Sequence, residues 1–134
     1  MTAVDARSVK RLEAVLPGLR WRVLTLLRLM HAHGHQMTVT SGRRTQAEQQ
    51  ALYAQGRTAP GKVVTQIDGV KKQSRHQQGR AVDCAFVLAP GQVSWDGPWE
   101  LYMAVAEELG LVAGGRWRRF PDRPHVEWLG PEDE

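Results

Sequence analysis

Cysteine is almost missing from this sequence, and no long apolar run is present. The single cysteine, Cys84, excludes an intramolecular disulfide and a cysteine-based zinc finger. The N-terminal residues lack the basic start and apolar stretch of a signal peptide, and the apolar residues 23–30 include Arg28 and are too few to span a bilayer. We therefore expect synthesis in the cytoplasm without a signal peptide, and no membrane insertion.

Charge of one sign is not concentrated in any segment. The formal net charge is +4, and the basic residues that produce it are scattered along the chain. This distribution favours a solvated surface over a dedicated nucleic-acid face, so we predict no nucleic-acid partner. A length of 134 residues with 42% apolar residues predicts one domain over residues 1–134. We expect this domain to act as a monomer.

Hydrophobic periodicity and turn residues divide the chain into helices and strands. Helices are predicted at residues 4–15, 19–32, 46–55 and 99–109, the third after a Thr45/Glu48 capping box. The helices within residues 1–36 are expected to pack on the rest of the domain. Strands are predicted at residues 37–40, 63–67, 81–86 and 125–129. The remainder of 57–73, then 90–98 and 111–117, are read as loops or turns, and 130–134 as a frayed acidic tail.

Three residues of metal-ligand type are candidates for one site: His76, Asp83 and His125. Alternation along the third strand turns Asp83 away from Cys84 and the apolar face, and a turn at Gly79 can carry His76 over the start of that strand. Two imidazoles and a carboxylate leave a zinc ion one position for water. We therefore predict bound zinc in a metal-dependent hydrolase.

A second carboxylate, Asp122, lies three residues before His125 in a Pro-Asp-Arg-Pro turn. Because this turn is rigid, it can hold the two side chains in a fixed relation. Asp122 is therefore the candidate that takes a proton from water and passes it to a leaving amine. A positive group must also face the oxyanion, and an arginine at the end of the first strand, Arg43 or Arg44, can do so.

These residues form motifs that resemble a known family. Ser41-Gly-Arg-Arg-Thr, Ser74-x-His76-x-x-Gly79-x-Ala81-x-Asp83 and Asp122-x-x-His125-x-Glu-Trp are similar to motifs of the zinc D-Ala-D-Ala carboxypeptidase, dipeptidase and L-alanyl-D-glutamate endopeptidase family of peptidoglycan hydrolases. The resemblance covers residues 39–128. It implies an α+β fold, a small antiparallel sheet flanked by helices, as in the Hedgehog-type zinc domain. It also implies zinc ligands His76, Asp83 and His125, catalytic Asp122 and Arg44, and Ser74 in substrate binding.

The substrate implied by the resemblance is a peptidoglycan stem peptide. Aspartate at position 122 is more similar to the phage endolysin branch, which cuts the L-Ala-D-Glu bond, than to the dipeptidases. We expect that bond, with D-Ala-D-Ala carboxypeptidase or dipeptidase activity as the alternative. The resemblance places the action at the cell wall or periplasm, after release by a holin-type partner or as part of a virion.

One position departs from the family pattern. Arg43 stands where the family has an aromatic residue, so Arg43 competes with Arg44 for the catalytic role. We assign Arg44 to catalysis and Arg43 to substrate binding.

Other residues have a plainer interpretation. The pair His31 and His35 has helical ligand spacing but lacks the glutamate of HExxH, so these histidines and His33 are read as exposed helix-end residues. We expect Cys84 to be a buried, inert thiol. Glu127 either orients His125, contacts substrate, or is an exposed edge-strand carboxylate.

Two further interpretations apply to the chain as a whole. Zinc could structure a module that binds wall peptide or a protein partner without cleaving it, although Asp122 argues against this. A basic nucleic-acid binder would show steeply salt-dependent DNA binding and no metal requirement. Trp99, Trp117 and Trp128 are read as core or groove-wall residues under all these interpretations.

Overall fold

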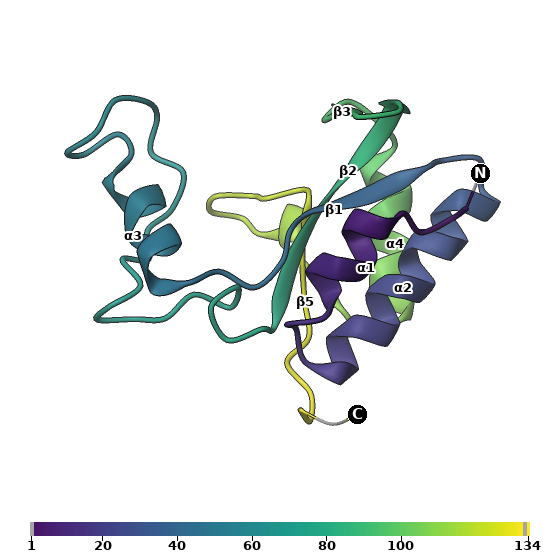
Figure 1. The fold of residues 1–134 in the computed structure, drawn as a ribbon, viewed down its shortest axis with the longest axis horizontal. Helices are drawn as coiled ribbons and strands as arrows, with labels where there is room; N and C mark the ends of the chain where they lie inside the picture. The colour runs from purple at the N-terminus through teal and green to yellow at the C-terminus, as the bar shows by residue number, and fades with distance from the viewer. Residues whose placement is uncertain (1, 133) are drawn as a thin grey trace.

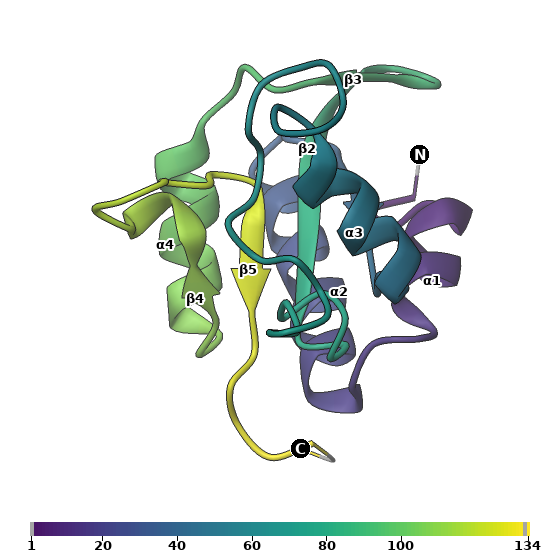
Figure 2. The same cartoon turned by 90° about the vertical axis from the view of Figure 1, so that its left-hand side faces the viewer.

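The computed structural model describes residues 2–132 and 134. An antiparallel sheet has the strand order β1-β2-β5-β4, with β3 also paired to β2. The strands are β1 (Met37–Ser41), β2 (Ala81–Ala89), β3 (Gln92–Ser94), β4 (Val112–Ala113) and β5 (His125–Glu127). Helices α1 (Ala6–Leu12), α2 (Pro17–Ala32) and α4 (Trp99–Glu108) lie on one side of it, and α3 (Gln46–Ala54) with long loops on the other (Figures 1 and 2). The predicted α+β fold is confirmed.

The first helix is shorter than predicted at both ends, and the second begins two residues earlier than predicted. Helix α1 begins after Asp5, whose carboxylate accepts a hydrogen bond from the Ser8 N–H at 2.8 Å, and it ends at Leu12. Pro17 opens α2 because its fixed φ and missing N–H suit the first helical turn. Among residues 2–132 and 134, no helix combines the length and the apolar character needed to cross a membrane.

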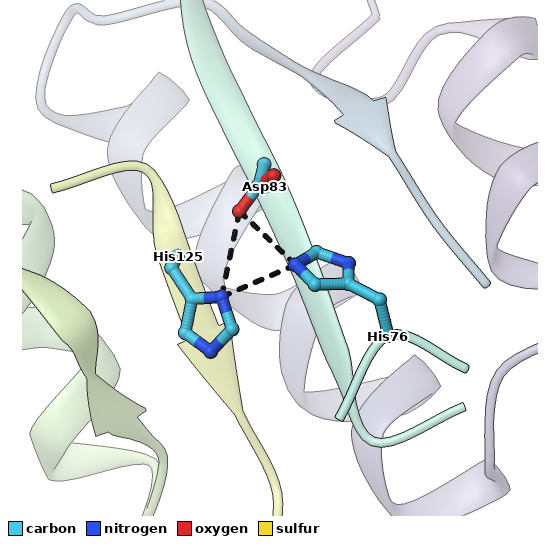
Figure 3. Close-up of side chains that lie close together, drawn as sticks. All are labelled: His76, Asp83 and His125. Atoms are coloured by element: carbon cyan, nitrogen blue, oxygen red, sulfur yellow. Dashed lines mark hydrogen bonds and ion pairs between the residues drawn. The ribbon is translucent and has the colours of Figure 1, made fainter. Parts of the chain in front are cut away.

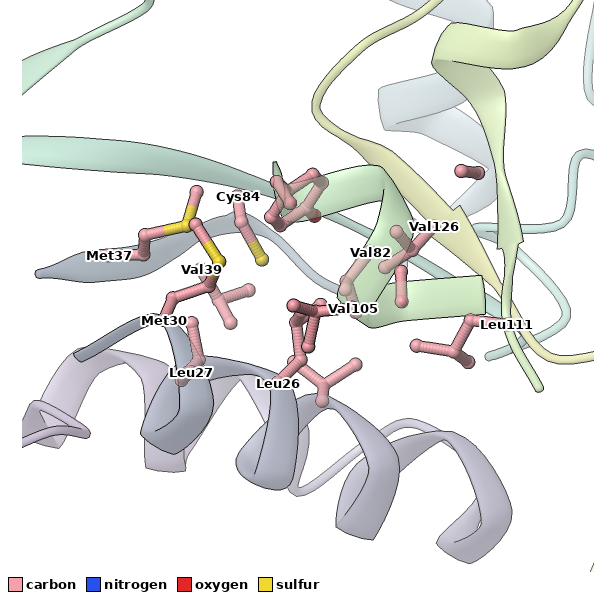
Figure 4. Packing of buried hydrophobic residues seen from close by; sticks show 14 of the residues in the cluster. Leu26, Leu27, Met30, Met37, Val39, Val82, Cys84, Val105, Leu111 and Val126 are labelled. Atoms are coloured by element: carbon pink, nitrogen blue, oxygen red, sulfur yellow. The ribbon is translucent and has the colours of Figure 1, made fainter. Parts of the chain in front are cut away.

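The core lies between α2 and the sheet (Figure 4). Leu26, Leu27 and Met30 of α2 are fully buried, as are Met37 and Val39 of β1. Removing each of these side chains from water contributes about 1.5–3 kcal/mol. This contact determines which face of the sheet is buried in the apolar core, and the opposite face is available for polar groups.

Strand β2 sends successive side chains to opposite faces. Val82 and Cys84 enter the core and are fully buried, so Asp83 between them faces the side of α3 and the loops. Burial raises the pKa of the Cys84 thiol to about 12. The thiol is therefore protonated and shielded, as the sequence predicted.

Residues 63–67 do not form the predicted strand. Within the described chain these residues pair with no strand, and side chains meet their polar groups instead. Gln49 Nε2 donates to the Ile67 carbonyl at 2.8 Å, and the Ile67 N–H donates to Thr65 Oγ1 at 3.1 Å. β-Branched residues favour strands only where a neighbouring strand is available to pair with them.

Two segments predicted as loops or turns contain short strands. Residues 90–98 contain β3, which forms a hairpin with β2 around Gly91 at φ +74°. Residues 111–117 contain β4 and the 3-10 turn η1 (Gly114–Arg116). Both strands are too short for a period-two pattern to be recognised in sequence.

The tail was predicted to be frayed, and this was wrong at its start. The Gly130 carbonyl accepts a hydrogen bond from Arg80 Nη1 at 2.9 Å. The Pro131 carbonyl accepts one from the indole N–H of Trp128 at 2.9 Å. One distant side chain, Arg80, and one nearby side chain, Trp128, thus hold the first residues after β5.

Candidate metal centre

The side chains of His76, Asp83 and His125 converge on the sheet face opposite the core (Figure 3). Asp83 in β2 pairs in register with His125 in β5, and His76 comes from the loop before β2. His76 Nε2 lies 3.2 Å from His125 Nδ1 and 3.5 Å from Asp83 Oδ1. His125 Nδ1 lies 3.6 Å from the same Asp83 oxygen. The three residues predicted as ligands are therefore brought together.

A tight turn positions His76. It closes at Gly79, which has φ +71° and donates its N–H to the His76 carbonyl at 3.3 Å. The Arg44 N–H donates to the same carbonyl at 3.1 Å. The ring Nδ1 lies 3.2 Å from the Gly42 carbonyl. With Nδ1–H donated there, the Nε2 lone pair faces the other two candidate ligands.

The surroundings of Asp83 indicate whether these residues fit a metal ion. Its Oδ1 is buried and has no hydrogen-bond partner among the described residues. Burial alone would raise the pKa of Asp83, but the imidazoles of His125 and His76 outweigh burial and hold the pKa well below its usual range. An anionic oxygen without a partner, within 4.8 Å of two ring nitrogens, is the donor set of a divalent metal ion. The residues present therefore fit a bound metal.

Glu127 lies behind His125. Its Oε1 is 2.6 Å from His125 Nε2, and both side chains are buried. The interpretation of Glu127 as an exposed edge-strand carboxylate was wrong, because β5 lies inside the sheet between β2 and β4. Burial alone would lower the pKa of His125, but the carboxylates of Asp83 and Glu127 outweigh it and raise the pKa to about 9.

Asp122 lies at the edge of the cluster. Its Oδ2 is 3.8 Å from His125 Nδ1, and its side chain is 48% exposed. Burial and the neighbouring Asp83 raise the pKa of Asp122. Gly114 allows this approach, because a Cβ there would lie 2.7 Å from the Asp122 carbonyl and 3.0 Å from the His125 Cβ.

The two candidate arginines occupy different surroundings. Arg44 Nη2 lies 3.4 Å from Asp83 Oδ2, and Arg44 lines the cavity over the cluster. Arg43 Nε instead donates to the Gln77 carbonyl at 3.0 Å, and its Nη1 to the Ala14 carbonyl at 3.4 Å. Only Arg44 of the two lies beside the candidate metal ligands.

A cavity of about 580 Å³ opens over the cluster. One wall consists of residues 63–67 with Leu52, and the other includes Trp117, Phe120 and Pro121. The centroid of the Trp117 ring lies 4.9 Å from that of His125, as expected for a groove wall. Ser74 also lines the cavity, but it is buried and its Oγ accepts the Gln77 N–H at 3.2 Å.

The histidines near the end of α2 take no part in this site. In the part of the chain that the structure describes, no group of three ligand-type side chains includes His31, His33 or His35. Trp99 and Trp128 do not line the cavity and are buried in the core.

Comparison with known proteins shows the family to which the chain belongs. A family model described as D-alanyl-D-alanine carboxypeptidase matches residues 14–97, which is more than half of the chain. The chain belongs to the D-alanyl-D-alanine carboxypeptidase family. A second model with the same description matches residues 68–128, which contain all three candidate ligands.

Two relatives of this family member are named for their bond specificity. The chain is 36% identical over 106 residues to the peptidoglycan L-alanyl-D-glutamate endopeptidase CwlK of Bacillus subtilis, covering 72% of this chain and 62% of CwlK. The chain thus spans about 62% of the length of that relative. The structure of the L-Ala D-Glu endopeptidase ChiX of Serratia marcescens is similar with a TM-score of 0.69 and 29% identity, covering 94% of this chain and 90% of ChiX.

A third protein is similar in fold alone. The LD-carboxypeptidase LdcB superposes with a TM-score of 0.65 at 15% identity, over 87% of this chain and 59% of LdcB. These similarities confirm the resemblance that the motifs indicated.

Sequence reasoning missed most of the cavity walls of this family member. Val63, Val64 and Phe120 are 44%, 56% and 67% exposed and line the cavity. The available signal was apolar residues in segments otherwise rich in turn residues. Residues 63–67 were read as a strand, and Phe120 was given no role.

Proposed function

We propose that the chain is a zinc-dependent peptidase that cuts peptidoglycan stem peptides at the L-Ala-D-Glu bond. The observation that carries the proposal is the convergence of His76, Asp83 and His125 beside a partly exposed carboxylate, Asp122, at the base of an open cavity. The names of CwlK and ChiX, both L-alanyl-D-glutamate endopeptidases, support the choice of bond.

The separations of the ligand atoms support zinc as the metal. In a tetrahedral zinc site with bonds of about 2.0–2.1 Å, neighbouring ligand atoms lie about 3.3 Å apart. The three separations in this cluster are 3.2, 3.5 and 3.6 Å. Three protein ligands of this mixed type also leave a coordination position open, as catalytic sites do and structural sites do not.

The chemistry divides between the ion and the chain. When bound, zinc supplies Lewis acidity that polarises a peptide carbonyl and acidifies water. Asp122 takes the proton from the water that attacks the carbonyl carbon and delivers it to the amide nitrogen as the C–N bond breaks. The products are a new carboxylate and a new amine. Arg44, beside Asp83, donates N–H groups toward the oxygen that becomes negative.

The cavity supports a peptide substrate. Its apolar walls can hold the backbone and side chains of an extended peptide, with Ser74 at the base as a substrate contact. Arg43 donates to the Gln77 and Ala14 carbonyls and is not among the residues that line the cavity, so its proposed role in substrate binding requires a peptide that extends beyond the cavity. The proposed substrate lies in the cell wall, and release by a holin-type partner or carriage in a virion stays a prediction.

D-Ala-D-Ala carboxypeptidase activity is the second candidate, because both matching family models carry that description. The two activities yield different products from the same substrate. An endopeptidase of the proposed kind leaves peptides with N-terminal glutamate and glycan-linked C-terminal alanine. A carboxypeptidase releases free D-alanine and leaves the rest of the stem intact.

Mass spectrometry of digested sacculi tests the proposal. The zinc-loaded chain is incubated with purified sacculi that contain pentapeptide stems, and the His76→Ala chain serves as control. We expect new N-terminal glutamate with the wild-type chain alone. Free D-alanine without that terminus would favour the second candidate, and neither product from a zinc-loaded chain would overturn the proposal.

A further inference from the structure

Helix α3 is attached to the site by a polar side chain. Among its residues only Gln49 is fully buried, with 0% of its surface exposed, whereas the adjacent Gln50 is exposed. Helices normally dock through an apolar stripe, and a buried amide is stabilising only when its hydrogen bonds are made. The partners of Gln49 therefore identify what this helix is docked to.

The amide of Gln49 joins two parts of the cavity. Its Oε1 accepts a hydrogen bond from Arg44 Nη1 at 3.0 Å. Its Nε2 donates to the Ile67 carbonyl at 2.8 Å and to Thr65 Oγ1 at 3.3 Å. Arg44 lies beside Asp83, and residues 65 and 67 belong to one cavity wall, so one side chain spans from the arginine to the wall.

The chemistry of the partners fixes the orientation of this amide. A guanidinium only donates and a backbone carbonyl only accepts. Rotating the amide by half a turn would set the Gln49 NH₂ against the Arg44 donors and its oxygen against the Ile67 carbonyl. Both hydrogen bonds would be lost in a buried place, so the amide has a single workable orientation.

The wall is held at a second point by another buried glutamine. Gln77 Nε2 donates to the Gly69 carbonyl at 3.1 Å, and Gln77 Oε1 accepts the Ser74 N–H at 2.8 Å. Gly69 lies against both glutamines, since a Cβ there would be 2.9 Å from Gln49 Cγ and 3.2 Å from Gln77 Oε1. Residues 63–69 have no strand partner in the described chain, so these side-chain contacts take the place of a sheet ladder.

We infer that Gln49 is a positioning residue that couples the wall at residues 63–67 to Arg44, so that a bound peptide meets the wall and the arginine at one fixed spacing. The inference deepens the proposed function and rests on it for the identity of the bound peptide. The coupling itself is a property of the folded chain, and it is measurable without turnover.

Two variants separate the two contacts of Gln49. Gln49→Glu has the same shape and can still accept from Arg44, but it cannot donate to the Ile67 carbonyl. Gln49→Met fills a similar volume and makes neither contact. Gln50→Glu and Gln50→Met are matched controls, because residue 50 is exposed on the same helix. Each variant is compared at equal zinc content, which also reports that the chain has folded.

The rate of limited trypsin digestion measures how firmly the wall at residues 63–67 is held. The segment that bears the wall contains Lys62, Lys71 and Lys72 as cleavage sites. We expect both Gln49 variants to be cut there at least about fivefold faster than wild type, since a buried hydrogen bond is lost, and both Gln50 variants at the wild-type rate. Equal cleavage of the Gln49 and Gln50 variants would overturn the inference, whether or not the chain is a peptidase.

Steady-state kinetics on a stem peptide tests the coupling between the wall and Arg44. Gln49→Glu is expected to raise KM with a smaller change in kcat, because Arg44 keeps its acceptor while the wall is released. Gln49→Met is expected to raise KM and lower kcat as well. A fall in kcat alone in both variants, with KM unchanged, would contradict the role of Gln49 at the wall. Absence of turnover in the wild type would count against the proposed function and leave the digestion result to decide the inference.

Discussion

Glu127 Oε1 lies 2.6 Å from Nε2 of His125, with both side chains buried, and this contact leaves His125 Nδ1 as the nitrogen that faces Asp83. The other imidazole has the same design, since the Gly42 carbonyl lies 3.2 Å from Nδ1 of His76 and Nε2 faces the cluster. Each ring is thus held at one nitrogen by a protein acceptor. The second nitrogen is left free to bind an ion.

Removing the carboxylate of Glu127 is expected to weaken metal binding without removing a ligand. Glu127→Gln should lower zinc affinity by about 10–100-fold, because His125 loses the anionic acceptor that fixes its orientation and basicity. Competition with a chelator of known affinity measures this change. Glu132→Gln is the control, since the Glu132 side chain is 78% exposed and does not belong to the cluster. Equal affinities for wild type and Glu127→Gln would show that the contact does not support the ligand.

Replacing Asp122 is expected to separate metal binding from turnover. Asp122→Asn should retain zinc and lower kcat by about 10²–10⁴-fold, because the proton transfer between water and the leaving amine loses its base. Zinc content and hydrolysis of a stem peptide are measured on the same sample, with the exposed Asp96→Asn as control. A fully active Asp122→Asn chain would refute the assignment. Loss of zinc together with activity would instead mean that Asp122 is a ligand.

Asp5 is expected to give the stability of the fold a pH dependence of its own. Burial alone would raise the pKa of Asp5, but hydrogen bonds from Ser8 and Thr38 outweigh it and lower the pKa. A pKa lowered on folding stabilises the native state above the ordinary carboxyl range, and the stabilisation is lost as pH falls through the folded value.

Two substitutions separate the cap of α1 from the charge of Asp5. Asp5→Ala should cost about 1 kcal/mol at neutral pH through loss of the cap. Asp5→Asn keeps an acceptor for the Ser8 N–H and removes only the charge. Its loss in the free energy of unfolding relative to wild type should therefore shrink below about pH 4, where the wild-type carboxylate becomes protonated. Denaturant unfolding at a series of pH values measures both. If the difference in the free energy of unfolding between Asp5→Asn and wild type were constant with pH, the charge of Asp5 would not contribute to stability.

The grouping of His76, Asp83 and His125 could be predicted because strand alternation is a local property of the sequence. Alternation within one strand sets Asp83 opposite Cys84, and alternation within another sets His125 beside Glu127. Neither relation depends on distant parts of the chain. The motif spacing then needed only an antiparallel pairing of the two strands, which the structure contains.

The surroundings of the cluster could not be predicted because they depend on contacts between distant segments. Arg43 and Arg44 are adjacent in sequence, and only the family resemblance favoured Arg44; in the structure Arg43 donates to the Gln77 carbonyl, whereas Arg44 lies beside the Asp83 carboxylate. Residues 63–67 carry strand-forming side chains, yet the buried amide of Gln49 takes the Ile67 carbonyl that a strand would have paired. A buried glutamine on a helix whose other residues are exposed or half-buried gives no sequence signal.

Zinc stoichiometry is the most direct test of the central claim, that three side chains hold one catalytic metal ion. The metal-stripped chain is equilibrated with zinc and desalted, and bound zinc is measured for wild type, His76→Ala and Asp83→Ala. We predict one zinc per wild-type chain and close to none in either variant. A wild-type chain that retains no zinc, or a His76→Ala chain that retains the full amount, would contradict the account.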